Sequence, residues 1–388
     1  MKLALKTRLV VAVALLSSCS SLLAALPIPA PPTLNVSSYF VVDANTGKVI
    51  AAMDPDKPVE PASLTKLMTA FVVFQALRAE QIQLADLVTI SRKARQTEGS
   101  RMFVEQGSQV SVENLLQGMI VQSGNDASVA LAEHIAGSEE VFAGLMNAYA
   151  QELGMVSSHF ENATGLPGTR HIASARDLAI LARAIIDEFP EYYRWYGQKS
   201  FAWGRDPATG DPIEQDNRNK LLWRDSSVDG MKTGYTQAAG YCLVSSAERN
   251  DMRLITVVTG APNENGRFSA SQSLLNYGFR FFETRTLYAG GDTVERARVW
   301  KGTVDMTSLG VADDVVVTIP RGRANDLQAS VTLPSTLQAP LNVQSRVGRL
   351  SIVLDGEPVA EATLVALEDV PAGGLWKRMT DSISLWFE

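Results

Sequence analysis

Serine and lysine residues stand at a spacing that suits nucleophilic acyl transfer. Ser63 and Lys66 lie three residues apart in the run Ser63-Leu64-Thr65-Lys66, where we expect a helix to begin. Positions i and i+3 share one face of a helix, so the lysine amine lies one turn beyond the serine hydroxyl. A serine hydroxyl is a weak nucleophile and needs an adjacent base. We therefore expect Ser63 to be the nucleophile and Lys66 the general base.

Lys66 accepts a proton only if burial or nearby cations lower its pKa. Its neighbours Leu64, Leu67 and Met68 put it on a face that tends to be buried, and a buried lysine without a role is uncommon. Lys232 is the cation that we expect beside it. The alternative is an N-cap serine followed by a surface lysine, which fits the four residues equally well when they are taken alone.

Two further short motifs add to this chemistry. Ser123-Gly124-Asn125 falls in a polar loop between two expected helices, where a hydroxyl can relay protons and an amide can hold a substrate carbonyl. Lys232-Thr233-Gly234 opens an expected strand, where a cation and a hydroxyl suit a substrate carboxylate. The glycine would let the substrate backbone approach the strand edge. Taken alone, the first motif is equally a helix cap and the second an exposed strand end.

Other catalytic chemistries find little support. The chain has three histidines and no G-x-S-x-G sequence, so a histidine triad on a nucleophile elbow is not expected. No His/Cys cluster has the spacing of metal ligands, and we expect neither a metal nor an organic cofactor.

The order of elements predicts an α/β catalytic domain over residues 36–282. Two strands come first, then a long helix from Pro61 to about Arg78 and a mostly helical stretch over residues 111–187. Three strands joined by short turns follow, and short connections imply antiparallel neighbours. We therefore expect one five-stranded antiparallel sheet with helices on its faces and a helical subdomain. The expected strands are Ser38–Asp43, Lys48–Ala52, Met231–Tyr235, Tyr241–Ala247 and Leu254–Thr259, with a helix from about Arg267 to Phe282 after them.

A small all-β domain is expected over residues 283–370, because short β-rich segments recur there between glycines and prolines. These segments are Val299-Trp300, Val315–Ile319, Ala329–Leu333, Ile352–Leu354 and Thr363–Leu367.

The last segment, residues 371–388, predicts an amphipathic helix. Its apolar side chains fall within an arc of about 120° on a helical wheel. Two tryptophans and a phenylalanine on that face suit a membrane surface, and a terminal helix docked on its own β domain is the alternative. The apolar residues are Leu375, Trp376, Met379, Ile383, Trp386 and Phe387.

The pattern of the N-terminus predicts a secretory signal peptide over residues 1–25, followed by a stiff Pro-rich leader over residues 26–35. A lipoprotein attachment site at Cys19 is the alternative. The net charge is −7, and it becomes −10 without residues 1–25, which argues against binding nucleic acid. Cys242 then remains alone in an apolar run, where we expect a buried small hydrophobe and no disulfide.

The three motifs together, in this order, resemble the low-molecular-mass penicillin-binding proteins that act as D-alanyl-D-alanine carboxypeptidases. The resemblance covers essentially the whole chain, including an added β domain and a C-terminal amphipathic anchor. It is carried by extended matches: Pro61 to Met68, Gln122 to Ala127, Val228 to Gly234 and Tyr277 to Glu283.

The resemblance implies that the chain removes the terminal D-alanine from peptidoglycan stem peptides and is acylated by β-lactam antibiotics. Ser63 would be acylated, Lys66 would be the base and Ser123 would relay the proton. It also implies a periplasmic location, on the outer face of the cytoplasmic membrane. The remaining implied site residues are Asn125 for a substrate carbonyl, Lys232, Thr233, Arg218 and Arg267 for the terminal carboxylate, and the N–H groups of Ser63 and Tyr235 for the oxyanion.

One residue departs from the pattern, and two other functions share the motifs. Tyr235 follows Lys-Thr-Gly where relatives often carry histidine or threonine. A β-lactamase needs a second base for deacylation, and Glu161-Asn162-Ala163-Thr164 lies in about the right region without the partner asparagine. A non-catalytic wall-binding or β-lactam-sensing protein is the other alternative, although such a protein would have no need of both Lys66 and Ser123.

Overall fold

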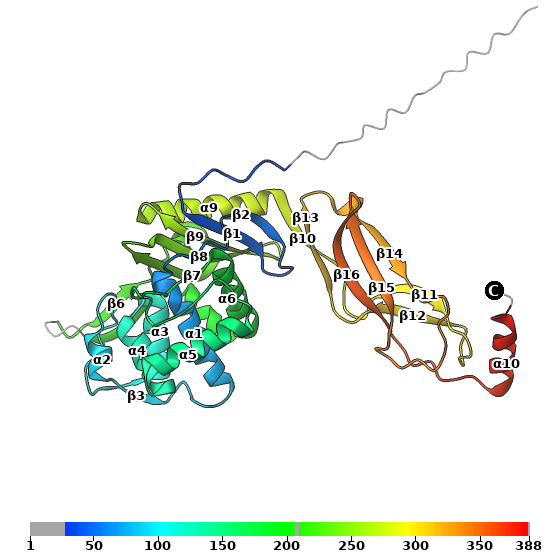
Figure 1. Cartoon of the computed structure of the whole chain (residues 1–388), viewed down its shortest axis with the longest axis horizontal. Helices are drawn as coiled ribbons and strands as arrows, with labels where there is room; N and C mark the ends of the chain where they lie inside the picture. The colour runs from blue at the N-terminus through cyan, green and yellow to red at the C-terminus, as the bar shows by residue number, and fades with distance from the viewer. Residues whose placement is uncertain (1–27, 206–208, 387–388) are drawn as a thin grey trace, which may run out of the picture.

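A computed structural model describes residues 28–205 and 209–386, which form an α/β domain joined end to end to a β domain (Figure 1). The expected signal peptide with Cys19, and Phe387 at the end of the chain, lie outside the described residues.

A five-stranded antiparallel sheet, in the order β2-β1-β9-β8-β7, forms the centre of the first domain. The expected sheet is confirmed, and each of its three later strands is longer than predicted. Short turns connect β7 to β8 and β8 to β9, which makes these strands antiparallel neighbours. The strands are β1 (Ser38–Asp43), β2 (Val49–Met53), β7 (Val228–Thr236), β8 (Gly240–Arg249) and β9 (Met252–Ala261).

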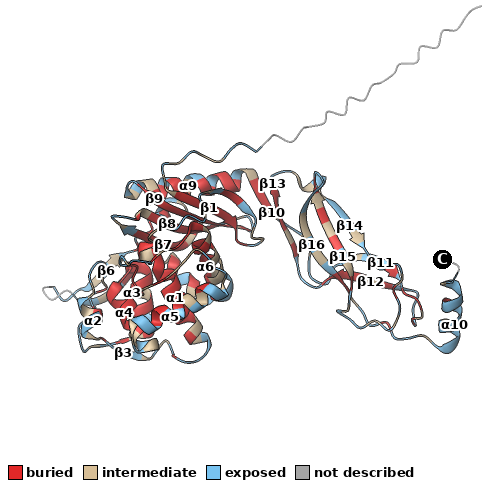
Figure 2. Cartoon of the chain, in the orientation of Figure 1, coloured by how far each residue is buried: buried red, intermediate tan, exposed pale blue. Residues whose placement is uncertain are grey.

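Side chains alternate between the two faces of the sheet along each strand, and helices cover both faces. The sheet is therefore buried on both sides. Leu243 of β8 faces helix α9 (Glu264–Phe281), whereas its neighbour Val244 faces the core on the other side, where α6 (Ala175–Glu188) packs. Buried residues run through both layers of the domain (Figure 2). Strand β7, which carries Lys232, Thr233 and Gly234, therefore lies at the edge of a well-packed sheet.

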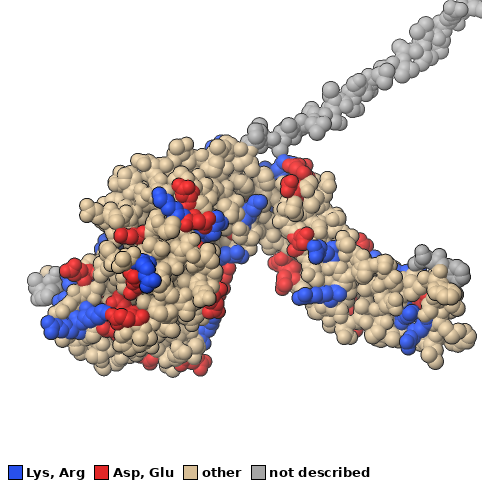
Figure 3. Space-filling model, in the orientation of Figure 1, with Lys and Arg blue, Asp and Glu red and all other residues tan. Residues whose placement is uncertain are grey.

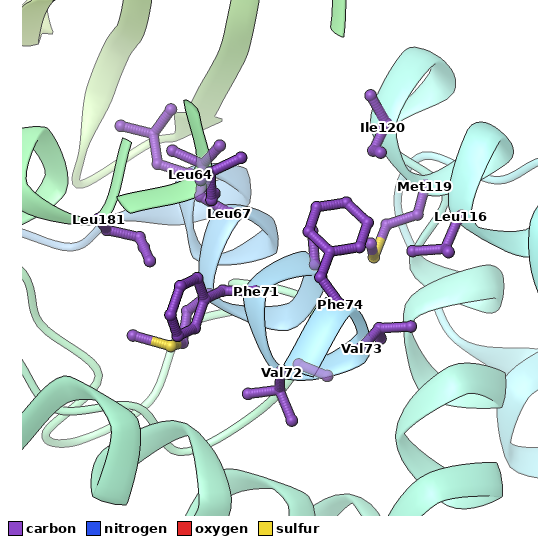
Figure 4. Close-up of a cluster of buried hydrophobic side chains, with 14 of the residues drawn as sticks. Leu64, Leu67, Phe71, Val72, Val73, Phe74, Leu116, Met119, Ile120 and Leu181 are labelled. Atoms are coloured by element: carbon purple, nitrogen blue, oxygen red, sulfur yellow. The ribbon is translucent and has the colours of Figure 1, made fainter. Parts of the chain in front are cut away.

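Helix α1 (Thr65–Arg78) passes through the middle of the helical part and is buried almost all round, as expected. Phe71 points toward Leu181 of α6, and Phe74 points toward α3 (Val112–Gln122) (Figure 4). Burial of each such side chain stabilises the fold by roughly 1.5–3 kcal/mol. This packing fixes the helix that follows Ser63.

The remaining elements of the domain surround α1. Two two-stranded sheets, β3–β4 and β5–β6, were not predicted. The additional elements are β3 (Leu87–Thr89), α2 (Arg92–Gln96), β4 (Gln109–Ser111), α4 (Asn125–Ala136), α5 (Glu139–Glu152), α7 (Pro190–Tyr193), a 3₁₀ turn at Arg194–Gly197, β5 (Ser200–Arg205), β6 (Pro212–Asp216) and α8 (Leu221–Arg224).

The C-terminal domain is all β, which confirms the expected class. Strands β11 (Thr293–Arg298), β12 (Met306–Val311), β16 (Glu357–Ala366), β15 (Arg346–Leu354) and β14 (Gln328–Thr332) form a sheet in that order. The strand expected at Val299-Trp300 is wrong, because β11 ends at Arg298 and Trp300 makes only an isolated bridge to Gln338.

A two-stranded ribbon, β10 (Phe282–Tyr288) and β13 (Val315–Pro320), joins the domains, and β10 continues directly from α9. The carboxylate of Asp43, at the end of β1, is fully buried there. It accepts hydrogen bonds from the hydroxyls of Thr284 and Thr318 on the ribbon. The junction is therefore tied to the central sheet by a buried polar cluster.

Helix α10 (Leu375–Ser384) contacts the β domain through polar side chains. Asp381 accepts a hydrogen bond from the Lys301 N–H at 2.6 Å, and Lys377 binds both Asp381 and Asp305. The apolar side chains Trp376 and Trp386 are 78% and 91% exposed. Within the described part of the chain, no helix has the length and apolar character needed to cross a membrane.

Candidate active site

Ser63 lies in a single 3₁₀ turn, Ala62–Leu64, that runs into α1, so the α-helix itself begins two residues later than the serine. The turn is packed tightly from two sides. A Cβ atom at Gly165 would lie 1.8 Å from the Ala62 carbonyl oxygen, and one at Gly234 would lie 3.0 Å from the Pro61 carbonyl oxygen. Gly234 is thus needed where β7 packs on the serine turn, a packing role that the sequence did not predict.

Lys66 Nζ lies at the centre of three contacts. It is 3.1 Å from Ser63 Oγ, 2.6 Å from Asn125 Oδ1 and 2.6 Å from the carbonyl oxygen of Thr164. The amide and carbonyl oxygens only accept, so they take two N–H bonds of the amine. A neutral amine has two N–H bonds and one lone pair, which then faces the Ser63 hydroxyl. The geometry is that of a lysine able to accept the serine proton.

Burial is the main reason that Lys66 is a usable base. The side chain is 1% exposed, and burial lowers its pKa to about 7. The positive charge of Arg218 lowers it further, while the negative charges of Asp126 and Glu139 oppose the shift. Arg218 is thus a cation near Lys66 whose influence the sequence did not predict.

Ser123 and Lys232 form a second buried contact. Ser123 ends α3 in a left-handed conformation, with φ of 64°, and its Oγ accepts a hydrogen bond from Lys232 Nζ at 3.0 Å. Lys232 is 3% exposed, and burial together with the charges of Lys66, Arg218 and Arg267 lowers its pKa well below the ordinary value. The fold thus brings the second and third motifs into direct contact, which the sequence did not predict.

Asn125 is the first residue of α4, and both polar atoms of its side-chain amide make hydrogen bonds. Oδ1 accepts from Lys66, and Nδ2 donates to the Glu98 carbonyl oxygen at 2.5 Å. One hydrogen of Nδ2 remains for a substrate carbonyl. The Asn125 N–H also donates to the Ser100 carbonyl oxygen at 2.7 Å, which brings the loop 98–104 to the site.

Asp126 holds that loop, a role that the sequence did not suggest. Its carboxylate is 1% exposed and accepts backbone N–H bonds from Met102, Phe103 and Val104 at 3.0, 2.9 and 3.3 Å. A carboxylate that accepts several backbone N–H bonds is a strong local anchor. Acidic residues in the first turn of a helix are common, so no sequence signal separated Asp126 from an ordinary capping residue.

These groups surround a cavity of about 300 Å³. Lys66, Asn125 and Lys232 support its walls through the contacts above, and the other predicted site residues line it. Ser100, Tyr241 and Glu264 line it as well and were missed, because each is a common residue type outside the three motifs. The lining residues are Ser63, Ser100, Ser123, Arg218, Thr233, Gly234, Tyr235, Tyr241, Glu264 and Arg267.

One end of the cavity is suited to a carboxylate. Arg267 is 5% exposed, donates one N–H to the Gly234 carbonyl oxygen at 3.2 Å and keeps an unpartnered Nε. Its guanidinium lies 5.5 Å from the ring centre of Tyr241, which packs against Tyr235 with 4.3 Å between ring centres. Arg267, Arg218 and Thr233 together offer donors to an anion at this end.

No cluster of metal-ligating side chains occurs among residues 28–205 and 209–386. Cys242 is buried, as expected, and burial raises the pKa of its thiol to about 11.

Comparison with known proteins decides the family. Residues 27–263 match the family model of the D-alanyl-D-alanine carboxypeptidases, peptidase S11, and residues 282–372 match that of the penicillin-binding protein 5 C-terminal domain. The chain belongs to the D-alanyl-D-alanine carboxypeptidase family. It is 43% identical to the D-alanyl-D-alanine carboxypeptidase DacC of Escherichia coli over 364 residues, which is 92% of this chain and 89% of that protein. It is 34% identical to DacF of Bacillus subtilis over 90% of this chain and 89% of that one.

Solved structures agree with this assignment. Penicillin-binding protein 5 from Haemophilus influenzae is 41% identical, with a TM-score of 0.81 over 88% of this chain and 99% of that one. Penicillin-binding protein D2 from Listeria monocytogenes, solved with ampicillin bound, is 28% identical, with a TM-score of 0.58 over 65% of this chain and 100% of that one. This protein is therefore a serine-type D-alanyl-D-alanine carboxypeptidase.

The alternative functions are not favoured for this carboxypeptidase. Glu161, the candidate second base of a β-lactamase, accepts a hydrogen bond from the Arg170 N–H and does not line the cavity. From the same segment, the backbone carbonyl of Thr164 accepts a hydrogen bond from Lys66 Nζ.

Proposed function

We propose that this carboxypeptidase releases the terminal D-alanine of peptidoglycan stem pentapeptides through an acyl-enzyme on Ser63. The Oγ of Ser63 attacks the carbonyl carbon of the penultimate D-alanine as its proton passes to Lys66 Nζ. The C–N bond to the terminal D-alanine then breaks, and the departing nitrogen takes that proton by way of the Ser123 hydroxyl. Water repeats the sequence on the ester: Lys66 takes its proton, the C–O bond breaks and Ser63 is regenerated.

The observation that carries this proposal is the three-way contact of the buried Lys66 amine. When the amine is neutral, the two fixed acceptors take its N–H bonds, and its lone pair is left for the Ser63 hydroxyl, whose Oγ lies 3.1 Å away. A pKa of about 7 leaves a large fraction of the amine neutral at neutral pH, which is the protonation state that a general base needs.

The other residues bind the reacting groups. The terminal carboxylate lies against Thr233, Arg218 and Arg267, and Lys232 lies behind them with its Nζ donating to Ser123 Oγ. The remaining Nδ2 hydrogen of Asn125 binds the carbonyl of the acyl-side residue. The backbone N–H groups of Ser63 and Tyr235 stabilise the oxyanion, since donors aimed at developing charge lower the barrier most.

The same chemistry predicts a stable adduct with β-lactams. A β-lactam carbonyl is attacked by Ser63 in the same way, and the ring opens without a departing fragment. No carboxylate from the Glu161 segment lines the cavity to speed hydrolysis. Because the amine of the opened ring stays attached and hinders the approach of water, the ester outlasts the one formed with a peptide. The ampicillin-bound relative supports this part of the proposal.

We also propose that α10 lies on the periplasmic face of the cytoplasmic membrane. Its polar side binds the β domain through Asp381, so the tryptophans on the other side are left for a lipid surface. The β domain then acts as a spacer between the membrane and the catalytic cavity. Removal of residues 371–388 should abolish co-sedimentation with phospholipid vesicles and leave D-alanine release unchanged.

The test of the main proposal combines two measurements on Ser63→Ala. D-alanine release from a peptide ending in D-Ala-D-Ala should fall to background, and labelling by a fluorescent penicillin should disappear. Mapping the labelled peptide of the parent should place the adduct on Ser63. Release at the parental rate, or an adduct on another residue, would refute the assignment.

A further inference from the structure

A buried histidine that the proposed mechanism does not use is bonded to the start of the catalytic helix. His171 is 1% exposed and does not line the cavity around Ser63, so it acts on the reaction only through other residues. Basic and acidic side chains lie side by side on the surface of the catalytic domain (Figure 3), where exposed ion pairs add little to stability. A polar side chain in the interior needs hydrogen-bond partners there, and His171 has two.

The two hydrogen bonds set which ring nitrogen of His171 carries the proton. The backbone N–H of Glu161 donates to Nδ1 at 2.9 Å, so Nδ1 is the unprotonated acceptor. Nε2 then carries the hydrogen and donates to the hydroxyl oxygen of Thr65 at 2.7 Å. Burial lowers the pKa of His171 to about 4, which keeps the ring neutral at neutral pH. The titratable groups whose charges act on the ring are Glu161, His159 and Lys66.

His171 thereby joins two segments of the chain that meet at Lys66. Thr65 is the first residue of α1, directly precedes Lys66 and is fully buried. The segment 161–165, whose first N–H binds the ring, supplies the carbonyl oxygen of Thr164 that accepts from Lys66 Nζ at 2.6 Å. The ring therefore bridges the helix that carries the base and the segment that contacts the base.

The segment 161–165 packs closely around the amine of Lys66. Thr164 is 2% exposed, and a Cβ atom at Gly165 would lie 1.8 Å from the Ala62 carbonyl oxygen. A retreat of this segment would admit water to Lys66. Burial is the main cause of the low pKa of that amine, so water there would raise its pKa toward the ordinary value.

We propose that His171 is a positioning residue for the reaction, which holds the segment 161–165 against α1 and so keeps water away from the Lys66 amine. This inference rests on the proposed role of Lys66 as the base. A second tie limits the effect, because Thr69 of α1 donates to the Ala163 carbonyl oxygen at 2.7 Å. Loss of the His171 bonds should therefore loosen the segment without releasing it.

The test measures the second-order rate constant for acylation by benzylpenicillin from pH 5 to pH 10. His171→Phe removes both hydrogen bonds and keeps an aromatic ring for the edge contact with Phe160. Its apparent pKa should lie about 0.5–1.5 above the parental value, because water at the amine cancels part of the effect of burial. Acylation at pH 7 should then be slower by about 2- to 16-fold, since the neutral fraction of the amine falls by that factor. The plateau at high pH should change by less than about twofold, because every Lys66 is neutral there.

Three further variants separate positioning from general stability. His171→Gln is the conservative change, because an amide offers both an acceptor and a donor, and it should restore most of the parental pH profile. Thr65→Val removes the acceptor on the other side of the ring and should raise the apparent pKa in the same direction as His171→Phe. His134→Phe is the matched control, since His134 is exposed on α4, and it should keep the parental profile.

A parental apparent pKa in His171→Phe, with only the melting temperature lowered, would show a merely structural role and overturn the inference. Equal profiles for His171→Gln and His171→Phe would overturn it too, because the two hydrogen bonds would then not matter. If His171→Phe does not fold, a parental profile in Thr65→Val has the same meaning. A parent that benzylpenicillin does not acylate, or whose rate does not rise with pH, would instead refute the proposed role of Lys66 and the inference with it.

Discussion

Replacing Lys66 with methionine tests the buried base through stability instead of activity. The folded pKa of Lys66 is about 7, against an ordinary value of 10.5. Because the folded pKa is the lower one, the unfolded chain binds more protons between about pH 7 and pH 10.5. The contribution of Lys66 to stability therefore rises with pH across that window.

The size of this effect follows from the two pKa values. Keeping Lys66 buried costs the parent about 4 kcal/mol at pH 7 and about 1 kcal/mol at pH 10. Lys66→Met removes this cost and also leaves Asn125 Oδ1 and the Thr164 carbonyl without a partner. That second loss, about 1–3 kcal/mol for each group, does not depend on pH. The stability of the variant relative to the parent should thus fall by about 3 kcal/mol from pH 7 to pH 10.

Urea unfolding of both proteins at pH 7 and pH 10 measures this difference. Circular dichroism at 222 nm reports on the catalytic domain, because the α-helices other than α10 lie there. Lys57→Met is the control, since Lys57 is exposed and its substitution should give the same difference at both pH values. A pH-independent difference for Lys66→Met would show that the amine keeps its ordinary pKa in the fold and would refute the argument from burial.

Three further predictions follow from the geometry. Asp126→Asn should slow penicillin acylation roughly tenfold or more, because an amide nitrogen cannot accept the loop N–H bonds. The control is Asp43→Asn, which alters a buried carboxylate at the domain junction; it should lower the melting temperature without slowing acylation. Gly234→Ala should lower kcat/KM by up to about 100-fold, because the new methyl group pushes β7 from the Pro61 carbonyl; a parental value would contradict the packing argument. Removal of residues 371–388 should raise the apparent vesicle dissociation constant at least tenfold with kcat unchanged, and retained binding would contradict the assignment of α10.

The sequence was sufficient for the parts of the site that depend on local spacing. Ser63 and Lys66 had to share a face because three residues separate them, and apolar neighbours on every side of α1 predicted that the lysine is buried. Alternating and short-turn patterns likewise predicted the five-stranded sheet. These features follow from periodicities that are written in one stretch of chain.

The partners that tune the site come from distant segments of the chain and could not be predicted from the sequence. Arg218 lowers the pKa of Lys66 from a position 152 residues further along the chain, a proximity that no local pattern encodes. Thr164 acts through its backbone carbonyl, for which any residue type would serve. Asp126 looked like an ordinary first-turn acid until the fold placed a loop over it.

The pH dependence of Ser63 acylation tests the central claim most directly. The second-order rate constant for benzylpenicillin should rise with pH and level off, with an apparent pKa of about 7 for the free enzyme, because only neutral Lys66 accepts the serine proton. Stopped-flow measurements from pH 5 to pH 10 cover the full range. A rate that is flat across this range, or one still rising toward pH 10 as for an ordinary lysine, would contradict the assignment of Lys66 as a neutral buried base.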